Sequence, residues 1–277
     1  MALKVAAVPL VLAAVASAQS SPSPTFLLDA SKQKGTVVKD TVAGVEFGTM
    51  AVSSVGSIKY WDLESATLTR SGGAKLTEGQ EYTHAFCESL AAHRLRSQLL
   101  SASLGCACVA GRLGLQWTPA REYRTLFHHS LSSPATPDHK GDHCQFTQDG
   151  MLGVRSNRAP AGPGGPEFNA CNPSGACYNI TADATWRFVV AVGKGVTATS
   201  PMGNTTFYVG GPAQPVNVGV AARTCCGMSY DRVGWPGPGP ANQGPGKVAS
   251  LAGWNVALTP TQIAAVYEET KPHFGYT

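Results

Sequence analysis

Histidine and aspartate residues gather between positions 128 and 143, where they could bind a metal ion. The cluster consists of His128, His129, Asp138, His139, Asp142 and His143. Asp138 and Asp142 would favour calcium, whereas His139 and His143 would favour zinc, because hard oxygen and borderline nitrogen ligands select different ions. Their spacing matches no fixed ligand motif, so a solvated loop is the simpler interpretation. We therefore expect no cofactor, with a divalent cation such as calcium as the alternative.

A second candidate site precedes the Pro- and Gly-rich stretch at 236–246. It contains Tyr230, Asp231, Arg232 and Trp235. A sugar ring could stack on Trp235 while Arg232 and Asp231 form hydrogen bonds with its hydroxyl groups. The alternative is that these residues fill the core. The cluster is thus a candidate ligand-binding site at the end of a strand.

Two cysteines lie close enough in sequence to form a local disulfide. Pro173 and Gly175 lie between Cys171 and Cys177 and favour a turn that would bring the two Cα atoms to about 4.4–6.8 Å. The chain has eight cysteines, and in an exported protein these favour disulfides over metal thiolates. Sequence does not fix the other pairings.

The N-terminal segment has the layout of a secretory signal peptide. Lys4 precedes an apolar run that ends in Ala16-Ser17-Ala18, which predicts cleavage after residue 18. We expect residues 19–24, rich in Ser and Pro, to be a disordered tether. The sequons at Asn179 and Asn204 agree with export and are candidate glycosylation sites.

Charge and hydropathy exclude two classes of partner. The formal net charge is +4, and the basic residues are scattered along the chain, which argues against a nucleic-acid-binding surface. No apolar stretch after the predicted signal peptide is long enough to cross a bilayer, for which about 20 residues are needed. We therefore expect a secreted protein without a nucleic-acid or membrane partner, whose oligomeric state the sequence leaves open.

The elements that would position these residues are short strands. Apolar and β-branched runs separated by Gly, Pro, Asn and Asp are typical of antiparallel strands joined by turns. The expected strands are Thr25–Asp29, Ala66–Thr69, Tyr123–His128, Cys144–Thr147, Leu152–Arg155, Arg187–Val192, Thr205–Val209, Ser229–Gly234 and Lys247–Trp254. We expect Trp186 and Trp254 to lie in the core, and the stretches 159–166 and 236–246 to be surface loops.

One helix is expected near the C-terminus. Thr259 and Gln262 form a capping box around Pro260 at the first helical position, a typical helix start. Ile263, Val266 and Tyr267 then fall on one face. The helix should pack on a sheet.

The stretch Leu251-Ala252-Gly253-Trp254-Asn255-Val256-Ala257-Leu258-Thr259-Pro260-Thr261-Gln262-Ile263-Ala264-Ala265-Val266-Tyr267 resembles the closing segment of concanavalin A-like and laminin G-like domains. In that family a last strand with a "WNxALT" ending leads into a short "xxIAAxY" helix. Weaker matches at 123–127, 149–154, 186–193 and 206–210 follow in the family's order. The resemblance implies an all-β fold over residues 25–277, a two-sheet antiparallel sandwich (jelly roll) with a short C-terminal helix.

The resemblance also bears on catalysis. Laminarinase-like glucanases of this fold carry Glu-x-Asp-x-x-Glu on one strand, since retaining hydrolysis needs two carboxyl groups about 5 Å apart. This sequence has no such triplet, because Asp62 and Glu64 are followed by no third acid at the required offset. A Gly-x-Ser-x-Gly nucleophile elbow is also missing. We therefore name no catalytic residue.

Residues 84–116 interrupt the family pattern. They lack strand alternation, and 88–104 is rich in Leu, Ala, Arg and Gln, which are good helix formers. A helix within a sandwich strand would break a ladder of backbone hydrogen bonds. We therefore expect a surface insertion that is helical or disordered. A gene-model error and a genuine functional lid are the alternatives.

These observations favour a binding protein. We expect a secreted glycan- or protein-binding module of the lectin or adhesion type, with a glycan or an extracellular protein as its partner. The first alternative is a diverged polysaccharide hydrolase or lyase on the same fold. The second is a structural component of a cell wall or matrix.

Overall fold

A computed structural model describes residues 22–63, 66–69, 71, 82–89, 124–128, 142–146, 151–156, 167–179, 186–194, 203–222, 232–236, 242–243 and 246–274. The fold is mostly β, with antiparallel pairing between all described strands. One short α-helix, α1 (Pro260–Thr270), lies near the C-terminus. The prediction of an all-β class with a C-terminal helix is thus confirmed.

The larger sheet has eight strands in the order β14-β13-β12-β7-β18-β5-β4, with β1 also paired to β18. Their bounds are β1 Phe26–Asp29, β4 Ser53–Val55, β5 Ile58–Asp62, β7 Tyr82–Ser89, β12 Trp186–Lys194, β13 Asn204–Gly210, β14 Val216–Ala222 and β18 Lys247–Trp254. Strands from both ends of the chain therefore meet in one sheet.

The smaller sheet has six strands in the order β11-β10-β9-β8-β15-β6. Their bounds are β6 Leu68–Thr69, β8 Arg124–His128, β9 Asp142–Phe146, β10 Leu152–Ser156, β11 Glu167–Asn169 and β15 Arg232–Val233. Two ribbons complete the β-structure, one of β2 (Val37–Lys39) with β3 (Glu46–Thr49) and one of β16 (Trp235–Pro236) with β17 (Asn242–Gln243). Two 3-10 helices, η1 (Ala30–Lys32) and η2 (Lys271–Phe274), flank β1 and α1.

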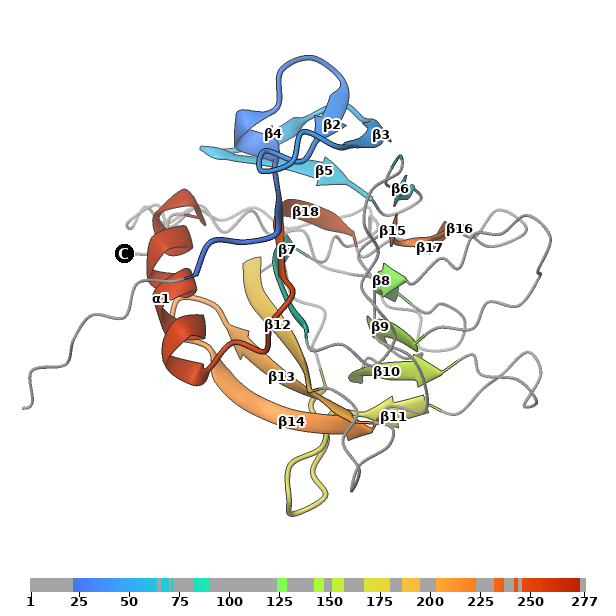
Figure 1. The fold of residues 1–277 in the computed structure, drawn as a ribbon, viewed down its shortest axis with the longest axis vertical. Helices are drawn as coiled ribbons and strands as arrows, with labels where there is room; N and C mark the ends of the chain where they lie inside the picture. The colour runs from blue at the N-terminus through green and yellow to red at the C-terminus, as the bar shows by residue number, and fades with distance from the viewer. Residues whose placement is uncertain are drawn as a thin grey trace, which may run out of the picture.

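The two sheets share one core. Leu68, Val154 and Val233 of the six-stranded sheet belong to the same buried cluster as Val189 and Leu251 of the eight-stranded sheet. In Figure 1, β8–β11 lie on one side of β12–β14 and the red α1 lies on the other. The eight-stranded sheet is therefore buried on both faces.

Helix α1 covers the second face of the eight-stranded sheet. Ile263, Val266 and Tyr267 are buried in a cluster with Phe188 and Trp254 of the sheet. The predicted capping box is present around Thr259 and Gln262. The expected helix, its start and its packing face are all confirmed.

Most of the expected strands are present with small shifts of their ends. The expected strands at 205–209 and 247–254 correspond to β13 and β18, and those at 123–128 and 152–155 to β8 and β10. Trp186 and Trp254 are 2% and 3% exposed, as predicted for core residues. Among the described residues, no helix is long and apolar enough to cross a membrane.

The boundary of the expected insertion at 84–116 needs correction. Residues 84–89 belong to β7, which lies between β12 and β18 in the eight-stranded sheet. Its two ladders supply the backbone hydrogen bonds that outweigh the helix propensity of these residues. The atypical segment therefore begins no earlier than residue 90, and residues 90–116 lie outside the described residues.

The expected disordered tether at 19–24 contacts the folded domain through Pro22. The indole nitrogen of Trp254 donates a hydrogen bond to the carbonyl oxygen of Pro22 at 2.8 Å. The expected tether at 19–24 is therefore ordered at its C-terminal end, because it supplies an acceptor to a buried indole.

The expected loop at 236–246 contains β17, which pairs with β16. Residues 1–21 and 159–166 lie outside the described residues.

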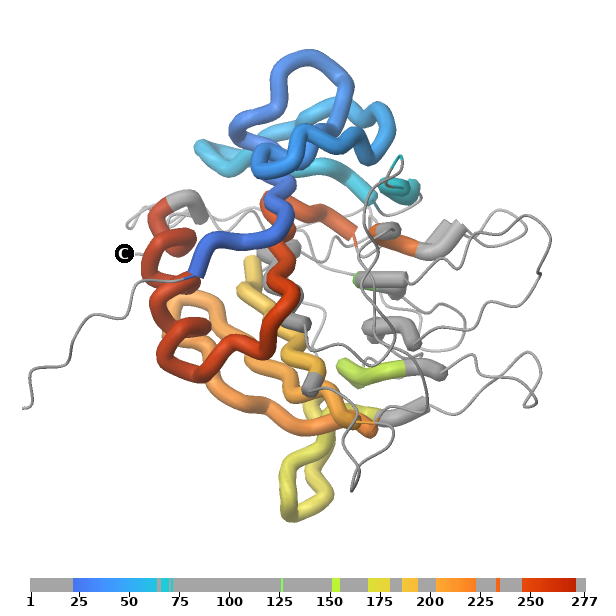
Figure 2. The backbone as a smooth tube through the Cα atoms, viewed as in Figure 1, coloured from blue at the N-terminus to red at the C-terminus, as the bar shows by residue number. Residues whose placement is uncertain are grey.

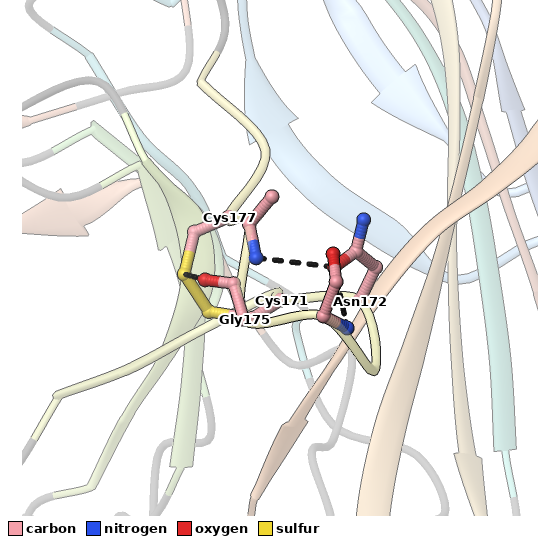
Figure 3. The surroundings of a disulfide bond; sticks show 6 residues. Cys171, Asn172, Gly175 and Cys177 are labelled. Atoms are coloured by element: carbon pink, nitrogen blue, oxygen red, sulfur yellow. Dashed lines mark hydrogen bonds between the residues drawn. A yellow bond between two sulfur atoms is a disulfide. The ribbon is translucent and has the colours of Figure 1, made fainter.

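The predicted disulfide joins Cys171 to Cys177, with their Cα atoms 3.8 Å apart, closer than expected. The loop between them is closed by the side chain of Asn172, whose Oδ1 accepts a hydrogen bond from the backbone N–H of Ala176 at 3.1 Å (Figure 3). The backbone of Cys171 exchanges two hydrogen bonds with Val220 of β14, and Ala170 donates to Leu152 of β10. The disulfide loop thus connects the two sheets along one edge.

Candidate functional site

One line of polar residues crosses the six-stranded sheet from strand to strand. Register pairs Thr69 with Arg232, Arg232 with His128, His128 with His143, His143 with Arg155, and Arg155 with Glu167. Residues directly opposite one another in an antiparallel ladder share a face of the sheet. We call this set the polar row: Thr69, Arg232, His128, His143, Arg155 and Glu167.

The polar row lies on the face of the sheet that points away from the core. Its neighbours along the strands, Leu68, Val154 and Val233, are each at most 2% exposed and belong to the core shared by the two sheets. Since successive strand residues alternate between faces, the polar row takes the opposite face, which we call the outer face. Thr69, at one end of the row, is exposed.

A second row of polar residues runs beside the first on the outer face. Register places Thr125 opposite Gln145, Gln145 opposite Gly153, and Gly153 opposite Asn169. The side-chain oxygen of Asn169 is buried and has no hydrogen-bond partner among the described residues. At this end of the outer face, Gly153 and the side-chain oxygen of Asn169 are therefore both covered.

Strand register brings together two residues that belong to separate clusters in the sequence. His143 comes from the candidate metal cluster and Arg232 from the candidate ligand cluster, and His128 lies between them in the polar row. Segments from far apart in the chain also meet in the larger sheet, where the blue β1 lies beside the red β18 in Figure 2. The row thus combines parts of both sequence candidates into one surface.

The other predicted metal ligands are not placed in this row. Asp142 is paired with Ser156 and takes the opposite face of β9 from His143, because consecutive strand residues alternate. Asp138 and His139 lie outside the described residues. Within the described part of the chain, no group of three His, Cys, Asp or Glu side chains could hold a metal ion. The metal site stays a prediction.

The predicted ligand-binding cluster is placed only in part. Arg232 lies in β15 and Trp235 in β16, where Trp235 is paired with Gln243 of β17. Tyr230 and Asp231 lie outside the described residues. The hypothesis of a sugar stacked on Trp235 therefore stays a prediction.

Two residues of the polar row are absent from the sequence candidates. Arg155 and Glu167 lie at the middle and the edge of the β11-β10-β9 part of the sheet. A local signal for Arg155 exists, because Leu152 and Val154 alternate with Gly153 and Arg155, a pattern that places Arg155 opposite the apolar face. Glu167 follows a Pro- and Gly-rich stretch and has no comparable signal.

Comparison with solved structures finds similarity of fold. Trypanosoma rangeli sialidase in complex with 2,3-difluoro-KDN superposes with a TM-score of 0.52 at 11% identity, over 93% of this chain and 34% of the sialidase. The same enzyme with 2,3-difluorosialic acid gives a TM-score of 0.51 at 11% identity, over 93% and 34%. The binding domain of botulinum neurotoxin serotype G gives 0.47 at 9% identity, over 90% and 51%.

These structural matches show similarity of fold and carry no information on the activity of this chain. The chain spans about a third of the length of the sialidases that it matches, and the identity shows a shared β-rich fold alone. No protein-family model matches the sequence. A search of curated proteins also gives no match.

Proposed function

We propose that this protein is a secreted glycan-binding module with a two-sheet, concanavalin A-like and laminin G-like sandwich fold. Its ligand binds on the outer face of the six-stranded sheet. The observation that carries the proposal is the polar row, in which Arg232, His128, His143 and Arg155 take directly opposed positions on four neighbouring strands.

The chemistry of these residues suits a sugar chain. Guanidinium groups donate several hydrogen bonds in a fixed planar geometry, and imidazoles both donate and accept them. Neighbouring strands lie about 4.8 Å apart, so these four register positions span about 14 Å across the sheet. An extended glycan with hydroxyl groups along its length can bond to several members of such a line at once.

A solvated outer face is the simpler alternative, because antiparallel sheets commonly have one polar face. Directly opposed residues of opposite charge stabilise such a face, whereas like charges directly opposite are destabilising. Here the four central positions hold two arginines and two histidines, and Glu167 lies at the end. This composition favours a binding surface.

The sandwich fold is supported by how the sheets pack. Both sheets contribute to one core, and β18 leads into α1 as in the closing segment of the family that the sequence resembles. Glycans suit this scaffold, since the sialidase of similar fold was solved with sugar-derived ligands.

Export is supported by the chemistry of the chain. A disulfide between Cys171 and Cys177 is typical of proteins that fold in an oxidising compartment. Asn179 and Asn204 are both exposed, which glycosylation requires. With the signal-like segment at residues 1–18, these features favour a protein that acts outside the cell.

A glycan array tests the proposal. The protein that begins at residue 19 should bind a subset of glycans, and the Arg155→Gln variant should lose that binding. Lys59→Gln is the matched control, because Lys59 is exposed on β5 of the other sheet and its removal also deletes one positive charge. An array without signal would instead favour a structural component or a protein partner. Release of sugar fragments from a bound polysaccharide would favour the hydrolase or lyase alternative.

A further inference from the structure

The sequon at Asn204 lies beside an exposed part of the end strand β14. We propose that Asn204 carries an N-linked glycan, and that this glycan covers β14 so that a second copy of the chain cannot associate there. The proposal rests on the export proposed above and is independent of the ligand that the protein binds. It gives the modification a structural role.

Strand β14 is the end strand that needs cover. It has seven residues, lies at one end of the eight-stranded sheet (Figure 1), and exposes Val216 and Val220 by 62% and 39%. The strand at the other end, β4, has three residues, two of which are exposed serines. A long apolar end strand can pair with another chain, whereas a short polar one is protected. The disulfide loop bonds to the backbone of β14 at Val220, and both valine side chains remain exposed.

Register places Asn204 next to this exposed surface. Asn204 is opposite Ala222, and Thr206 is opposite Val220. Since alternate strand residues share a face, these four side chains lie on one face, while Thr205 between them is buried. Directly opposed Cβ atoms lie about 5 Å apart, and diagonal neighbours about 7–8 Å. Asn204, Val220 and Ala222 are all exposed, so a glycan on Asn204 starts within this distance of both β14 residues.

The sequon has the residues that attachment of a glycan requires. Asn204-Thr205-Thr206 has a hydroxyl residue at its third position and no proline at its second, as the acceptor motif demands. The donor is a lipid-linked oligosaccharide diphosphate. The amide nitrogen of Asn204 bonds to C1 of the first sugar and gives up one proton, while the bond from C1 to the diphosphate oxygen breaks. The attached glycan is bulky and hydrophilic, so it separates β14 from a second copy.

Secretion of the full chain from cultured eukaryotic cells, followed by trypsin digestion and mass spectrometry, tests the modification. Arg187 and Lys194 lie between the two sequons, so Asn204 and Asn179 fall on different peptides. We expect most of the Asn204 peptide to carry hexose and N-acetylhexosamine, which a peptide amidase releases with conversion of Asn204 to aspartate. Asn204→Gln removes the sequon, whereas the matched control Thr206→Ser keeps both sequon and glycan.

Analytical ultracentrifugation of the secreted proteins tests the structural role. Asn204→Gln should raise the weight-average mass about twofold or more at high protein concentration, because two copies associate through β14. Thr206→Ser should sediment like the native protein, and so should Asn179→Gln apart from the mass of its own glycan. Adding Val220→Lys to Asn204→Gln should restore the lower mass, because a lysine on an end strand prevents pairing.

Each contrary outcome has a distinct meaning. Secreted protein with an unmodified Asn204 overturns the proposal and leaves export standing, whereas a chain that stays inside the cells overturns both. An Asn204→Gln variant that sediments like the native protein refutes the structural role. Association that Val220→Lys does not reverse uses another surface and refutes it too. If Asn204→Gln fails to fold, Asn179→Gln treated with the amidase after folding replaces it, with the same expected rise in mass.

Discussion

At the residue scale, Gly253 shows how closely β1 lies against β18. Register pairs Gly253 with Phe26, and a Cβ atom at Gly253 would overlap the Phe26 ring, with Cδ1 only 2.7 Å away. Phe26 is fully buried and stacks on Phe47, so its ring cannot move without disturbing the core. The glycine in the closing segment is therefore needed for packing.

Gly253→Ala should lower the free energy of unfolding by about 1–3 kcal/mol, the usual cost of overpacking a core. Chemical denaturation followed by tryptophan fluorescence measures this loss. Gly211→Ala is the control, because the nearest atom to its added Cβ is the carbonyl oxygen of Trp186 at 3.8 Å. Equal stability of the two variants would contradict the packing of β1 on β18.

At the element scale, the disulfide loop covers part of an edge strand. β14 is at one end of the eight-stranded sheet, and Cys171 bonds to the backbone of Val220 there. The same loop approaches so closely that a Cβ at Gly219 would lie 2.5 Å from the backbone of Ala170. Opening the disulfide should therefore loosen the connection between the two sheets.

Replacing both Cys171 and Cys177 by serine should destabilise the protein by about 2 kcal/mol, the loop-closure value for a short loop. Thermal unfolding under oxidising conditions measures this difference. A peptide map of the native protein should show both thiols blocked until a reductant is added. Alkylation of both thiols without reductant would refute the bridge.

Helix α1 is held to the turn between β13 and β14 by an exposed polar contact. Glu268 accepts a hydrogen bond from Gln214 at 3.0 Å and pairs with Lys271 at 2.6 Å. The hydrogen bonds from Lys271 and Gln214 lower the pKa of Glu268, and the bond to Glu268 raises the pKa of Lys271. The folded state thus favours the charged form of both groups.

The stabilisation by Glu268 should depend on pH in one direction. Because the pKa of Glu268 is lowered on folding, its contribution is fully present above the unfolded pKa and disappears as pH falls through the folded pKa. Glu268→Gln should therefore melt earlier than the native protein at neutral pH, and the difference should vanish in acid. High salt should shrink it too. A difference that grows as pH falls would contradict the assignment.

Elements with strong local signals could be predicted from the sequence. The capping box at Thr259 fixed the start of α1, and the alternation at 205–209 located β13. β14 was missed because Gly219 interrupts it and two of its three valines are exposed, Val216 at 62% and Val220 at 39%. β7 was missed because its pairing with β12 on one side and β18 on the other determines its strand conformation. The local sequence propensity does not reveal such pairing.

The candidate site could be predicted only in pieces for the same reason. His143 and Arg232 stood out in the sequence, but their common row depends on the register of β9, β8 and β15. A slip of one residue would move either residue to the core face. Register is set by contacts between distant segments, so no local pattern of residues could place them together.

At the scale of the whole molecule, the eight-stranded sheet is the central layer between the six-stranded sheet and helix α1. The six-stranded sheet packs on one of its faces and α1 on the other. β7 lies near the middle of this sheet and is followed along the chain by the atypical segment 90–116. The fold should therefore depend on residues 84–89 and tolerate the loss of 90–116.

Deletion of residues 90–116 with a short Gly/Ser linker should leave expression and melting temperature unchanged or improved. Changing 84–89 to a Gly/Ser sequence should abolish folding, because it removes a strand with neighbours on both sides. Circular dichroism and thermal melting compare the two variants. If the variant that lacks 90–116 fails to fold, that segment belongs to the core.

Histidine labelling with diethylpyrocarbonate, read by mass spectrometry, tests the central claim most directly. Saturation with a bound glycan should protect His128 and His143 of the polar row. His273 lies in η2, the segment that follows α1 in the chain; it is the internal control and should label equally with and without ligand. Unchanged labelling of His128 and His143 in the bound protein would contradict a glycan site on the outer face.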